Sequence, residues 1–283
     1  MSPAAPIRRR VPFLRYPGGK SRIADFLIQQ IISAATVDRR LVEPFVGSGS
    51  FFFAVNPPQA VLADLNPELI DLYRGIRLRP RAVWSQFRRF PSSKRAYYEI
   101  RSWASADLDL PRRAARTLFL NRTCFKGMWR HNAQGHFNVG YGGQDRRWVV
   151  TVRDLVQISH RLRSAVIRHA DFEDTIDNSN CGDFVFVDPP YRPGAREMIH
   201  DHYRFGKFSF QEHRRLAASL ARASKRGVLW ALTTSSHPDI VGLFGGNSIE
   251  RMPRCVGRKI GQLKRYCGEV LIKSCRSRNE TIF

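Results

Sequence analysis

The chain is poor in acidic residues and contains no long apolar run. Among its 283 residues, 24 are Asp or Glu and 47 are Lys or Arg, which gives a formal net charge of +23. A positive excess of this size predicts a polyanionic partner, most often a nucleic acid. No stretch approaches the ~20 apolar residues that a membrane helix needs, so we expect no membrane association.

The cysteines also exclude classes of protein. There are five, none of them spaced as Cys-x-x-Cys, so the sequence predicts neither a zinc site nor any other metal centre. Their odd number, together with the lack of an apolar leader in residues 1–10, is typical of reduced thiols. We therefore expect a cytoplasmic protein.

The most informative stretch is 182–191, Gly-Asp-Phe-Val-Phe-Val-Asp-Pro-Pro-Tyr. Its apolar run, 184–187, predicts a buried strand of a parallel sheet. Asp188 ends that strand, and Pro190 biases Pro189 toward an extended backbone, so no helix continues from it. Because ligands of open α/β sheets bind at the carboxyl ends of strands, we expect a site here.

The residues at this strand end suit methylation of an exocyclic amine. An adenine amino group is a poor nucleophile because its lone pair is delocalised into the ring. The Asp188 carboxylate and the Pro189 carbonyl can accept its two N–H bonds, and Tyr191 can stack on the base. The alternative is a carboxylate that only caps a turn, which we would prefer for Asp-Pro alone.

Two glycine-rich turns lie upstream. In 13–20, Phe-Leu-Arg-Tyr-Pro-Gly-Gly-Lys, Gly18 permits a tight turn, and Lys20 is expected to face an anion. Ser21 is the predicted N-cap of a helix over 22–32. Residues 41–53 predict a strand, a turn around Gly47 and Gly49, and a helix; without Gly-Lys-Ser/Thr, a nucleotide P-loop is disfavoured.

A second strand is predicted at 60–64 and ends in Asp64. An acid at the end of the strand that follows a glycine-rich turn is where nucleotide-binding folds hold a ribose diol. Asn66 and Pro67 are expected to cap a helix that begins near Glu68.

The order of the motifs at 13–20, 43–49 (Glu-Pro-Phe-Val-Gly-Ser-Gly), 63–66 (Ala-Asp-Leu-Asn) and 188–191 resembles the Dam family of adenine-specific DNA methyltransferases over nearly the whole chain. The resemblance implies an α/β fold with a Rossmann-like methyltransferase sheet. It also implies S-adenosylmethionine as cofactor, double-stranded DNA as partner, and methyl transfer to N6 of a flipped adenine. The catalytic residues are then Asp188, Pro189, Pro190 and Tyr191.

Contacts with S-adenosylmethionine are expected along several of these motifs. The family often has tryptophan where Tyr16 stands, so an aromatic ring is kept. By resemblance, Asp171 holds the amino group of the cofactor adenine. The alternative is that Asp171 only caps the turn that follows it. The expected cofactor residues are Tyr16, Gly18, Lys20, Phe45, Gly47, Gly49, Asp64, Asp171, Phe172 and Asp188.

Residues 74–150 carry seventeen Lys and Arg and four Asp and Glu, interleaved with aromatic residues. A solvated basic face explains the charges but not the aromatic residues, some of which must form a small core, for example around 118–120. We predict an inserted, mostly helical DNA-recognition domain at 74–150, between catalytic parts at 1–73 and 151–283.

By resemblance, residues 120–139 contain the hairpin that enters the duplex, where Phe125 pushes into the base stack and Arg130 reads a guanine. Arg130 could alternatively stack on Trp129 and hold the hairpin. Lys126, Gly140 and Gly143 differ from relatives that methylate GATC, which leaves the target sequence open. The expected DNA contacts are Arg15, Arg122, Phe125, Lys126, Arg130, Asn132 and Asn138.

The remaining chain predicts strands at 166–169, 228–234 and 269–273, and helices at 154–162 and 211–224, the second capped by Ser209. His237 is expected to be structural. The basic segment from 251 up to the last strand is expected to form a flexible loop that closes over DNA.

Three alternatives from other classes bear on function. Methylation of the cytosine ring needs a cysteine nucleophile, usually after proline, and no cysteine here follows a proline. An RNA adenine N6-methyltransferase stays open because stacking and amine capture do not identify the sugar. A nonenzymatic DNA-binding regulator on the same scaffold is disfavoured by the intact Asp188 and Asp64. We expect a monomer, encoded by a bacterium or phage and associated with the nucleoid through DNA.

Overall fold

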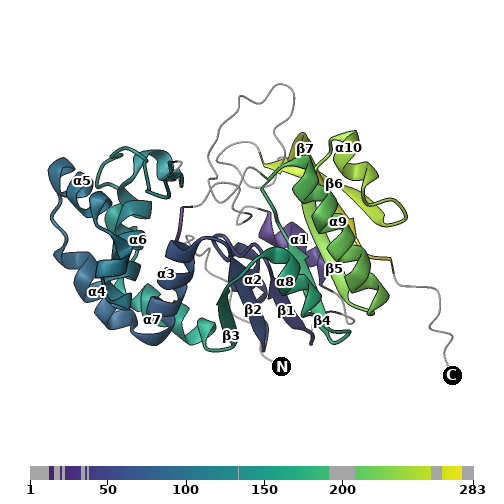
Figure 1. The fold of residues 1–283 in the computed structure, drawn as a ribbon, viewed down its shortest axis with the longest axis horizontal. Coiled ribbons are helices and arrows are strands. Elements are labelled where there is room, and N and C mark those ends of the chain that lie inside the picture. The colour runs from purple at the N-terminus through teal and green to yellow at the C-terminus, as the bar shows by residue number, and fades with distance from the viewer. Residues whose placement is uncertain are drawn as a thin grey trace.

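The computed structural model describes residues 13–15, 20, 23–32, 36, 38–132, 134–190, 208–255 and 263–275. These residues contain a seven-stranded sheet with the order β3-β2-β1-β4-β5-β7-β6 (Figure 1). Strands β1 to β5 pair in parallel, and β7 pairs antiparallel with both β5 and β6. The strands are β1 (Arg40–Glu43), β2 (Ala60–Asp64), β3 (Ala165–His169), β4 (Asp183–Val187), β5 (Leu229–Ser235), β6 (Ser248–Cys255) and β7 (Leu263–Lys273). The predicted α/β class and Rossmann-like sheet are confirmed.

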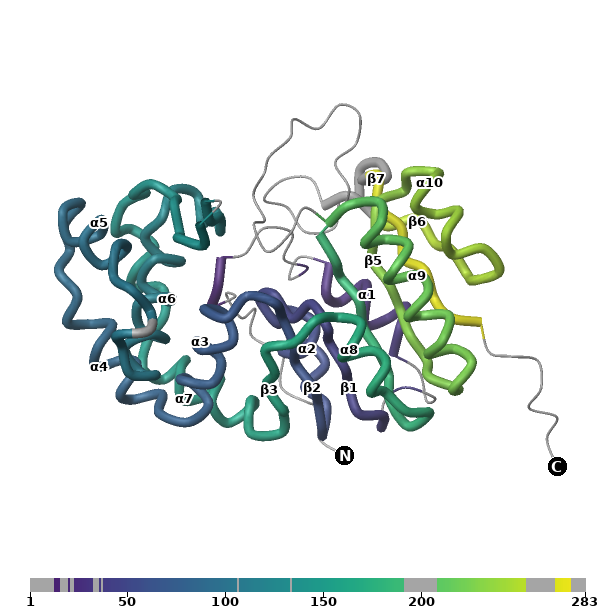
Figure 2. Tube along the Cα trace, in the orientation of Figure 1, coloured from purple at the N-terminus to yellow at the C-terminus, as the bar shows by residue number. Residues whose placement is uncertain are grey.

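Each face of the sheet is covered by its own helices, as parallel sheets require. Successive side chains of a strand point to opposite faces. Leu41 and Phe184 accordingly belong to the core under α1 (Ala24–Ile31) and α2 (Ser50–Val55). Val42 and Val185 belong to the core under α8 (Phe172–Asp177) and α9 (Phe210–Lys225). Figure 2 shows α8 and α9 together over one face of the sheet.

A group of helices lies beside the β3 edge of the sheet (Figure 1). It comprises α3 (Pro67–Leu78), α4 (Pro80–Arg89), α5 (Lys94–Ser102), α6 (Leu110–Thr123) and α7 (Val152–Leu162). Residues 118–120 are fully buried in it, as predicted. Helix α3 runs without interruption across the predicted boundary at 73/74, and the core of this helical group is continuous with one face of the sheet.

Arg147 is the largest fully buried side chain of the helical group. Its guanidinium donates to the carbonyl oxygens of Phe87 and Phe90 and lies over the ring of Phe119. Burial lowers the pKa of Arg147. At least one of the basic residues in 74–150 is therefore buried, where it binds backbone carbonyls instead of facing a partner.

Most predicted helix starts are confirmed by side-chain caps. The Asn66 side chain accepts from the backbone N–H groups of Glu68 and Leu69, and Ser209 accepts from Glu212. His237 caps the short helix α10 (Pro238–Gly242), so its structural role is also confirmed. The predicted cap of the first helix is wrong: α1 begins after Ile23, which offers no side-chain cap, and Ser21 lies outside the described residues.

The predicted loop from 251 to the last strand is also wrong in part. Residues 248–255 form β6, and β7 begins at Leu263, well before the predicted start at 269. Arg251 and Pro253 hide the strand pattern, and the ladder is irregular around Pro253. Proline is tolerated there because β6 is the outermost strand of the sheet. Among the described helices, none is long and apolar enough to cross a bilayer.

Candidate active site

The sheet changes its winding direction between β1 and β4, which are neighbours in space but far apart in the chain. Ligands of doubly wound sheets bind outside the carboxyl ends of the strands at such a switch point. Glu43 is the last residue of β1, and Asp188 directly follows the last residue of β4. The structure thus places two carboxyl side chains at the position where the topology favours a ligand.

Asp188 is held by two side chains from distant parts of the chain. Lys20 Nζ lies 3.1 Å from Asp188 Oδ1, and Thr233 Oγ1 donates to the same oxygen at 2.6 Å. Lys20 Nζ is also 3.9 Å from a carboxylate oxygen of Glu269 on β7. The prediction that Lys20 faces an anion is confirmed, and the anions that the structure shows are protein carboxylates.

The rest of the predicted catalytic motif is described as far as residue 190. Pro189 is buried and Pro190 is half-buried. Tyr191 lies outside the described residues, as do Tyr16 and Gly18. Sequence reasoning missed Thr233, whose only signal was a pair of threonines inside an otherwise apolar strand.

Glu43 is a second functional candidate that the sequence reading did not single out. It is buried, and its Oε1 has no hydrogen-bond partner among the described residues. Burial raises the pKa of Glu43 well above its usual range, and the nearby charge of Asp188 raises it further. The raised pKa favours the neutral form of Glu43, which reduces the repulsion between the two carboxyl groups at the switch point.

Asp64 fastens the glycine turn to the end of β2. Its Oδ2 accepts from the Gly47 N–H at 3.1 Å, and its Oδ1 accepts from the Asn66 N–H at 2.9 Å. Burial raises the pKa of Asp64 to about 6, although both backbone hydrogen bonds oppose the shift. Gly49 has a positive φ of 64°, and a Cβ there would lie 2.9 Å from the Phe53 ring. That glycine is required by turn geometry and packing.

Phe45 belongs to a cluster of aromatic rings. Phe45 stacks on Phe172 with ring centroids 5.3 Å apart, and Phe208 meets both rings. S-adenosylmethionine presents an adenine, a ribose diol and an amino acid group. The aromatic cluster, the buried carboxyl group of Asp64 and the cation of Lys20 match these three parts in chemical type, so the described residues fit the predicted cofactor.

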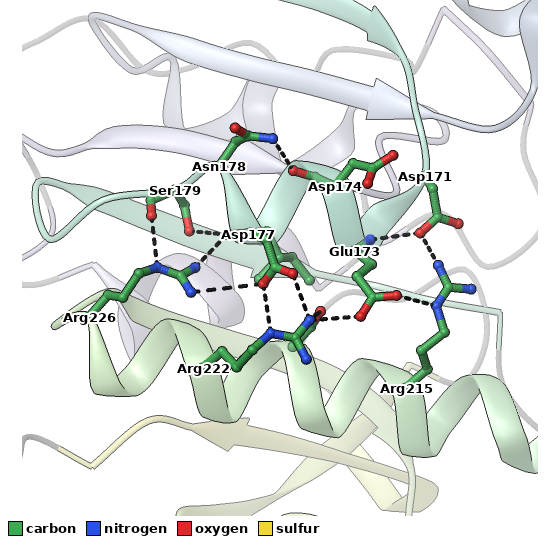
Figure 3. Close-up of polar contacts among 11 residues, drawn as sticks. Asp171, Glu173, Asp174, Asp177, Asn178, Ser179, Arg215, Arg222 and Arg226 are labelled. Carbon is green, nitrogen blue, oxygen red and sulfur yellow. Dashed lines mark hydrogen bonds and ion pairs between the residues drawn. The ribbon is translucent and has the colours of Figure 1, made fainter.

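Figure 3 shows a network of polar contacts that ties α8 to α9. Asp171 is the N-cap of α8, and its Oδ1 accepts from the Glu173 N–H at 2.9 Å, so the expected cap is present and the predicted contact with the cofactor stays a prediction. Arg215 binds Asp171 and Glu173, and its guanidinium carbon lies 4.4 Å from the centre of the Phe172 ring. Arg222 binds Glu173 and Asp177 instead (Figure 3).

The predicted hairpin is present between Cys124 and Tyr141. Antiparallel bridges join Cys124 with Tyr141 and His131 with Phe137. The Asn132 side chain accepts from the backbone N–H groups of Gln134 and His136 and so closes the turn. Asn132 is therefore engaged in shaping the hairpin, and its predicted DNA contact stays a prediction.

Phe125 is 46% exposed, which is unusual for a phenylalanine and suits the predicted insertion into a base stack. Lys126, the residue after it, has a left-handed backbone with φ 52° and places its ammonium 5.2 Å from the centre of the Phe125 ring. A cation and an exposed ring thus stand side by side at the base of the hairpin.

The arginines expected to contact DNA differ in position. Arg130 is half-buried, and its Nε donates to Asn138 Oδ1 at 2.9 Å. Arg122 is buried and donates to the Arg146 carbonyl, so its position lends no support to a direct DNA contact. Burial lowers the pKa of Arg122 to about 10, and the charges of Arg15 and Arg146 add to this effect. Arg15, Arg122 and Arg146 nevertheless make this part of the protein strongly positive.

The hairpin is anchored to α3 and α6 by a buried ionic cluster. Glu68 Oε1 accepts from Arg116 at 2.7 Å, and Glu68 Oε2 lies 2.9 Å from His131 Nε2. Arg116 also donates to the carbonyls of Ile100 and Arg101. Within the part of the chain that the structure describes, no group of His, Cys, Asp or Glu side chains could hold a metal ion.

Comparison with known proteins gives consistent matches. Residues 16–252 match the model of a family described as D12 class N6 adenine-specific DNA methyltransferase. The chain is 30% identical over 264 residues to a DNA N-6-adenine-methyltransferase of Escherichia phage P1, which covers 92% of this chain and 34% of the phage protein. It therefore spans about a third of the length of that relative.

Two further relatives match over most of their own length. Type II methyltransferase M1.LlaDCHI of Lactococcus lactis subsp. cremoris is 31% identical over 250 residues, which is 85% of this chain and 87% of the relative. A DNA adenine methylase of Haemophilus influenzae is 29% identical over 231 residues, with 80% and 79% covered.

Proposed function

We propose that this chain, which belongs to the D12 class of N6 adenine-specific DNA methyltransferases, is a site-specific enzyme. It would methylate N6 of a flipped adenine in duplex DNA. The observation that carries the proposal is the position of Asp188. It stands at the switch point of the sheet, directly before two prolines, and is oriented by Lys20 and Thr233.

Asp188 and Pro189 activate the target amine. The Asp188 carboxylate accepts one N–H bond of the adenine amino group, and the Pro189 carbonyl accepts the other. Both acceptors favour a nitrogen whose lone pair points out of the ring plane, toward the methyl group. As the new N–C bond forms, the bond between the methyl carbon and the sulfonium sulfur would break and leave a neutral thioether. Positive charge develops on nitrogen, and the Asp188 carboxylate stabilises it until the proton passes to solvent. Tyr191 is proposed to stack on the base.

The proposed cofactor is S-adenosylmethionine, which supplies an electrophilic methyl group on a sulfonium sulfur. Asp64 would hold the ribose hydroxyls, and Phe45 and Phe172 would pack against the adenine. Lys20 would share its charge between Asp188 and the cofactor carboxylate. Support comes from the burial of Asp64, from the packing of Phe45 on Phe172, and from the turn that Asp64 holds through the Gly47 N–H.

The proposed DNA-binding element is the hairpin from Cys124 to Tyr141. The whole protein would act on duplex DNA, as a monomer and in the cytoplasm. Phe125 would act as the wedge that offsets the unstacking needed to flip a base. Lys126, beside that ring, would meet the phosphate backbone. The many exposed cations of residues 74–150 would position the duplex without specifying its sequence.

The proposal is tested with purified protein, tritiated S-adenosylmethionine and unmethylated duplex DNA, followed by modification-sensitive sequencing of the product. We expect label in DNA as N6-methyladenine at one recurring sequence. Label in RNA but not in duplex DNA would favour the RNA methyltransferase alternative. Tight DNA binding without any label, by protein that binds the cofactor, would favour the nonenzymatic regulator.

The matched variant is Asp188→Ala, which removes the acceptor at the reacting amine but leaves the cations of the helical group in place. We expect at least a ~100-fold loss of kcat, comparable to the loss of one preorganised polar group at a reacting centre, with DNA affinity within a few-fold of the wild type. Near-normal turnover of this variant would remove Asp188 from the mechanism.

A further inference from the structure

We propose that Thr233 is a positioning residue that fixes the plane of the Asp188 carboxylate for attack by the target amine. The inference rests on the proposed function, since it assigns a role toward the carboxylate that is placed at the reacting centre. Thr233 itself touches neither cofactor nor base in this assignment. It acts only through Asp188.

The sequence and the register of the sheet bring the two residues together. Val187 is paired with Leu232 across β4 and β5, so the next residues along each strand, Asp188 and Thr233, stand opposite one another. Val187 and Leu232 both point into the core under α8 and α9. Alternation along the strands therefore turns Asp188 and Thr233 to the other face, which is the face that α1 covers.

The contact has the properties of a strong, directed hydrogen bond. Thr233 Oγ1 lies 2.6 Å from Asp188 Oδ1, within the range of a hydroxyl that donates to a carboxylate, and 3.4 Å from the Val187 carbonyl. Thr233 is fully buried, whereas the Asp188 side chain is 22% exposed. A β-branched side chain in a strand is restricted at χ1, so the hydroxyl is a fixed donor.

Asp188 needs such a donor because rotation of its carboxylate group is only weakly restricted by its own side chain. The terminal torsion of an aspartate has broad minima, so the carboxylate plane is not set by the backbone. Lys20 Nζ reaches the same Oδ1 at 3.1 Å, but it comes from a long, flexible side chain. The short bond from the rigid strand β5 fixes Oδ1, and the direction of the second carboxylate oxygen follows from the planarity of the group.

The neighbouring residue offers a matched control. Thr234 is also fully buried, on the opposite face of β5, and its hydroxyl has no hydrogen-bond partner among the described residues. Thr233→Val and Thr234→Val are therefore the same chemical change, one residue apart in the same strand. Only the first removes a donor to Asp188.

The experiment measures kcat, the KM values for DNA and cofactor, and the melting temperature of full-length Thr233→Val, Thr233→Ser and Thr234→Val. We expect Thr233→Val to lower kcat by 10- to 100-fold, because a small displacement of a reacting group has a cost of this order, with both KM values within about threefold of the wild type. Thr233→Ser, which keeps the hydroxyl, should recover kcat to within about fivefold of the wild type.

Thr234→Val should keep the kcat of the wild type. The inference is overturned if Thr233→Val keeps that kcat, or if Ser fails to recover it while the melting temperature is normal. It is also overturned if both Val variants lose kcat and melting temperature together, which is the signature of a merely structural residue.

Asp188→Ala, measured beside these variants, separates failure of the inference from failure of the proposed function. If Asp188→Ala is inactive and Thr233→Val is normal, only the inference fails. If Asp188→Ala turns over normally, the proposed function of the site fails, whatever the threonine variants do.

Discussion

Glu68 and His131 join the cofactor side of the molecule to the hairpin, with Glu68 Oε2 2.9 Å from His131 Nε2. Glu68 lies two residues after Asn66, whose backbone N–H is bound by Asp64. His131 lies in the hairpin, where it is paired with Phe137. The turn proposed to hold the ribose and the hairpin proposed to enter DNA are thus connected through one buried carboxylate.

Glu68→Gln is expected to destabilise the protein and loosen the hairpin. The change leaves Arg116 without the charge that offsets its burial and alters the contact with His131, and breaking a buried ion pair costs about 3 kcal/mol or more. Chemical denaturation should show this loss, and hydrogen exchange should rise in the hairpin. A variant with normal stability and normal exchange would mean that the cluster contributes nothing net.

The pH dependence of this contribution has a definite sign. Burial would raise the pKa of Glu68, but the His131 hydrogen bond and the Arg116 charge outweigh it, so the pKa is lowered below 4.5. A lowered acid pKa stabilises the fold above the unfolded value, and this stability is lost as pH falls through the folded value. Below pH ~4.5, Glu68→Gln should therefore lose stability less steeply than the wild type.

For Asp64 we expect the free energy of unfolding to change with pH in the opposite direction. Its pKa rises from 3.8 in the unfolded chain to about 6 in the fold, so the folded state keeps a proton that the unfolded chain has lost between these values. Stability from this group is present below pH ~4 and falls by an amount of order 3 kcal/mol as pH rises through 6. Asp64→Asn should flatten that part of the stability curve, as measured by denaturation at pH 4 to 7. Unchanged curvature would show that Asp64 titrates normally.

Arg215 is expected to support cofactor binding without contacting DNA. It holds Asp171 and covers the Phe172 ring, and both of these residues are expected to meet the cofactor adenine. Arg215→Gln should raise the cofactor Kd about fivefold, from the loss of roughly 1 kcal/mol of positioning, by calorimetry. Arg222→Gln is the matched control, because Arg222 binds Glu173 and Asp177 but is not bonded to Asp171 (Figure 3). Equal effects of both variants would point to general loosening of α9.

Sequence reading by the hairpin and general binding to phosphates can be separated by mutation. Arg130→Ala should relax the methylated sequence at one base, since a bidentate arginine–guanine pair discriminates by ~1–3 kcal/mol. Removal of Lys126 and Arg146, which are both exposed, should weaken binding to all sequences and reduce the salt slope by ~0.9 per lost phosphate contact. Arg113 is unsuitable for that test because it binds Asp71 at 2.9 Å.

The readout is the profile of methylated sites for each variant beside the wild type. If Arg130→Ala keeps every base preference while overall activity falls, its bond to Asn138 is its main role, and Arg130 belongs to the scaffold of the hairpin.

The strands and helices that were predictable are those with strong local signals. The apolar runs before Asp188 and Asp64 and the caps at Asn66 and Ser209 are all local, and each led to a correct element. The strand β6 was missed because Arg251 and Pro253 interrupt its pattern, and its pairing with β7 is a tertiary contact.

The candidate site was predictable in its residue types but not in its contacts. Nothing local to Thr233 shows that its hydroxyl meets Asp188, because that depends on the register between β4 and β5. Arg122 was expected by resemblance to contact DNA, yet its place on the inner side of α6 buries it. The charges in a sequence predict which region is positive overall, but only the fold shows which of its arginines are exposed enough to contact DNA.

The antiparallel strand β7 has a consequence for synthesis of the protein on the ribosome. β7 covers the side of β5 that is not paired with β4, with Leu271 opposite Thr233. Until residues 263–273 have left the exit tunnel, β5 is an open edge with unsatisfied backbone groups, which can pair with another nascent chain. The carboxylate of Glu269 therefore reaches its place near Lys20 only after β7 emerges, and the edge of β5, the strand that carries Thr233, is covered only then.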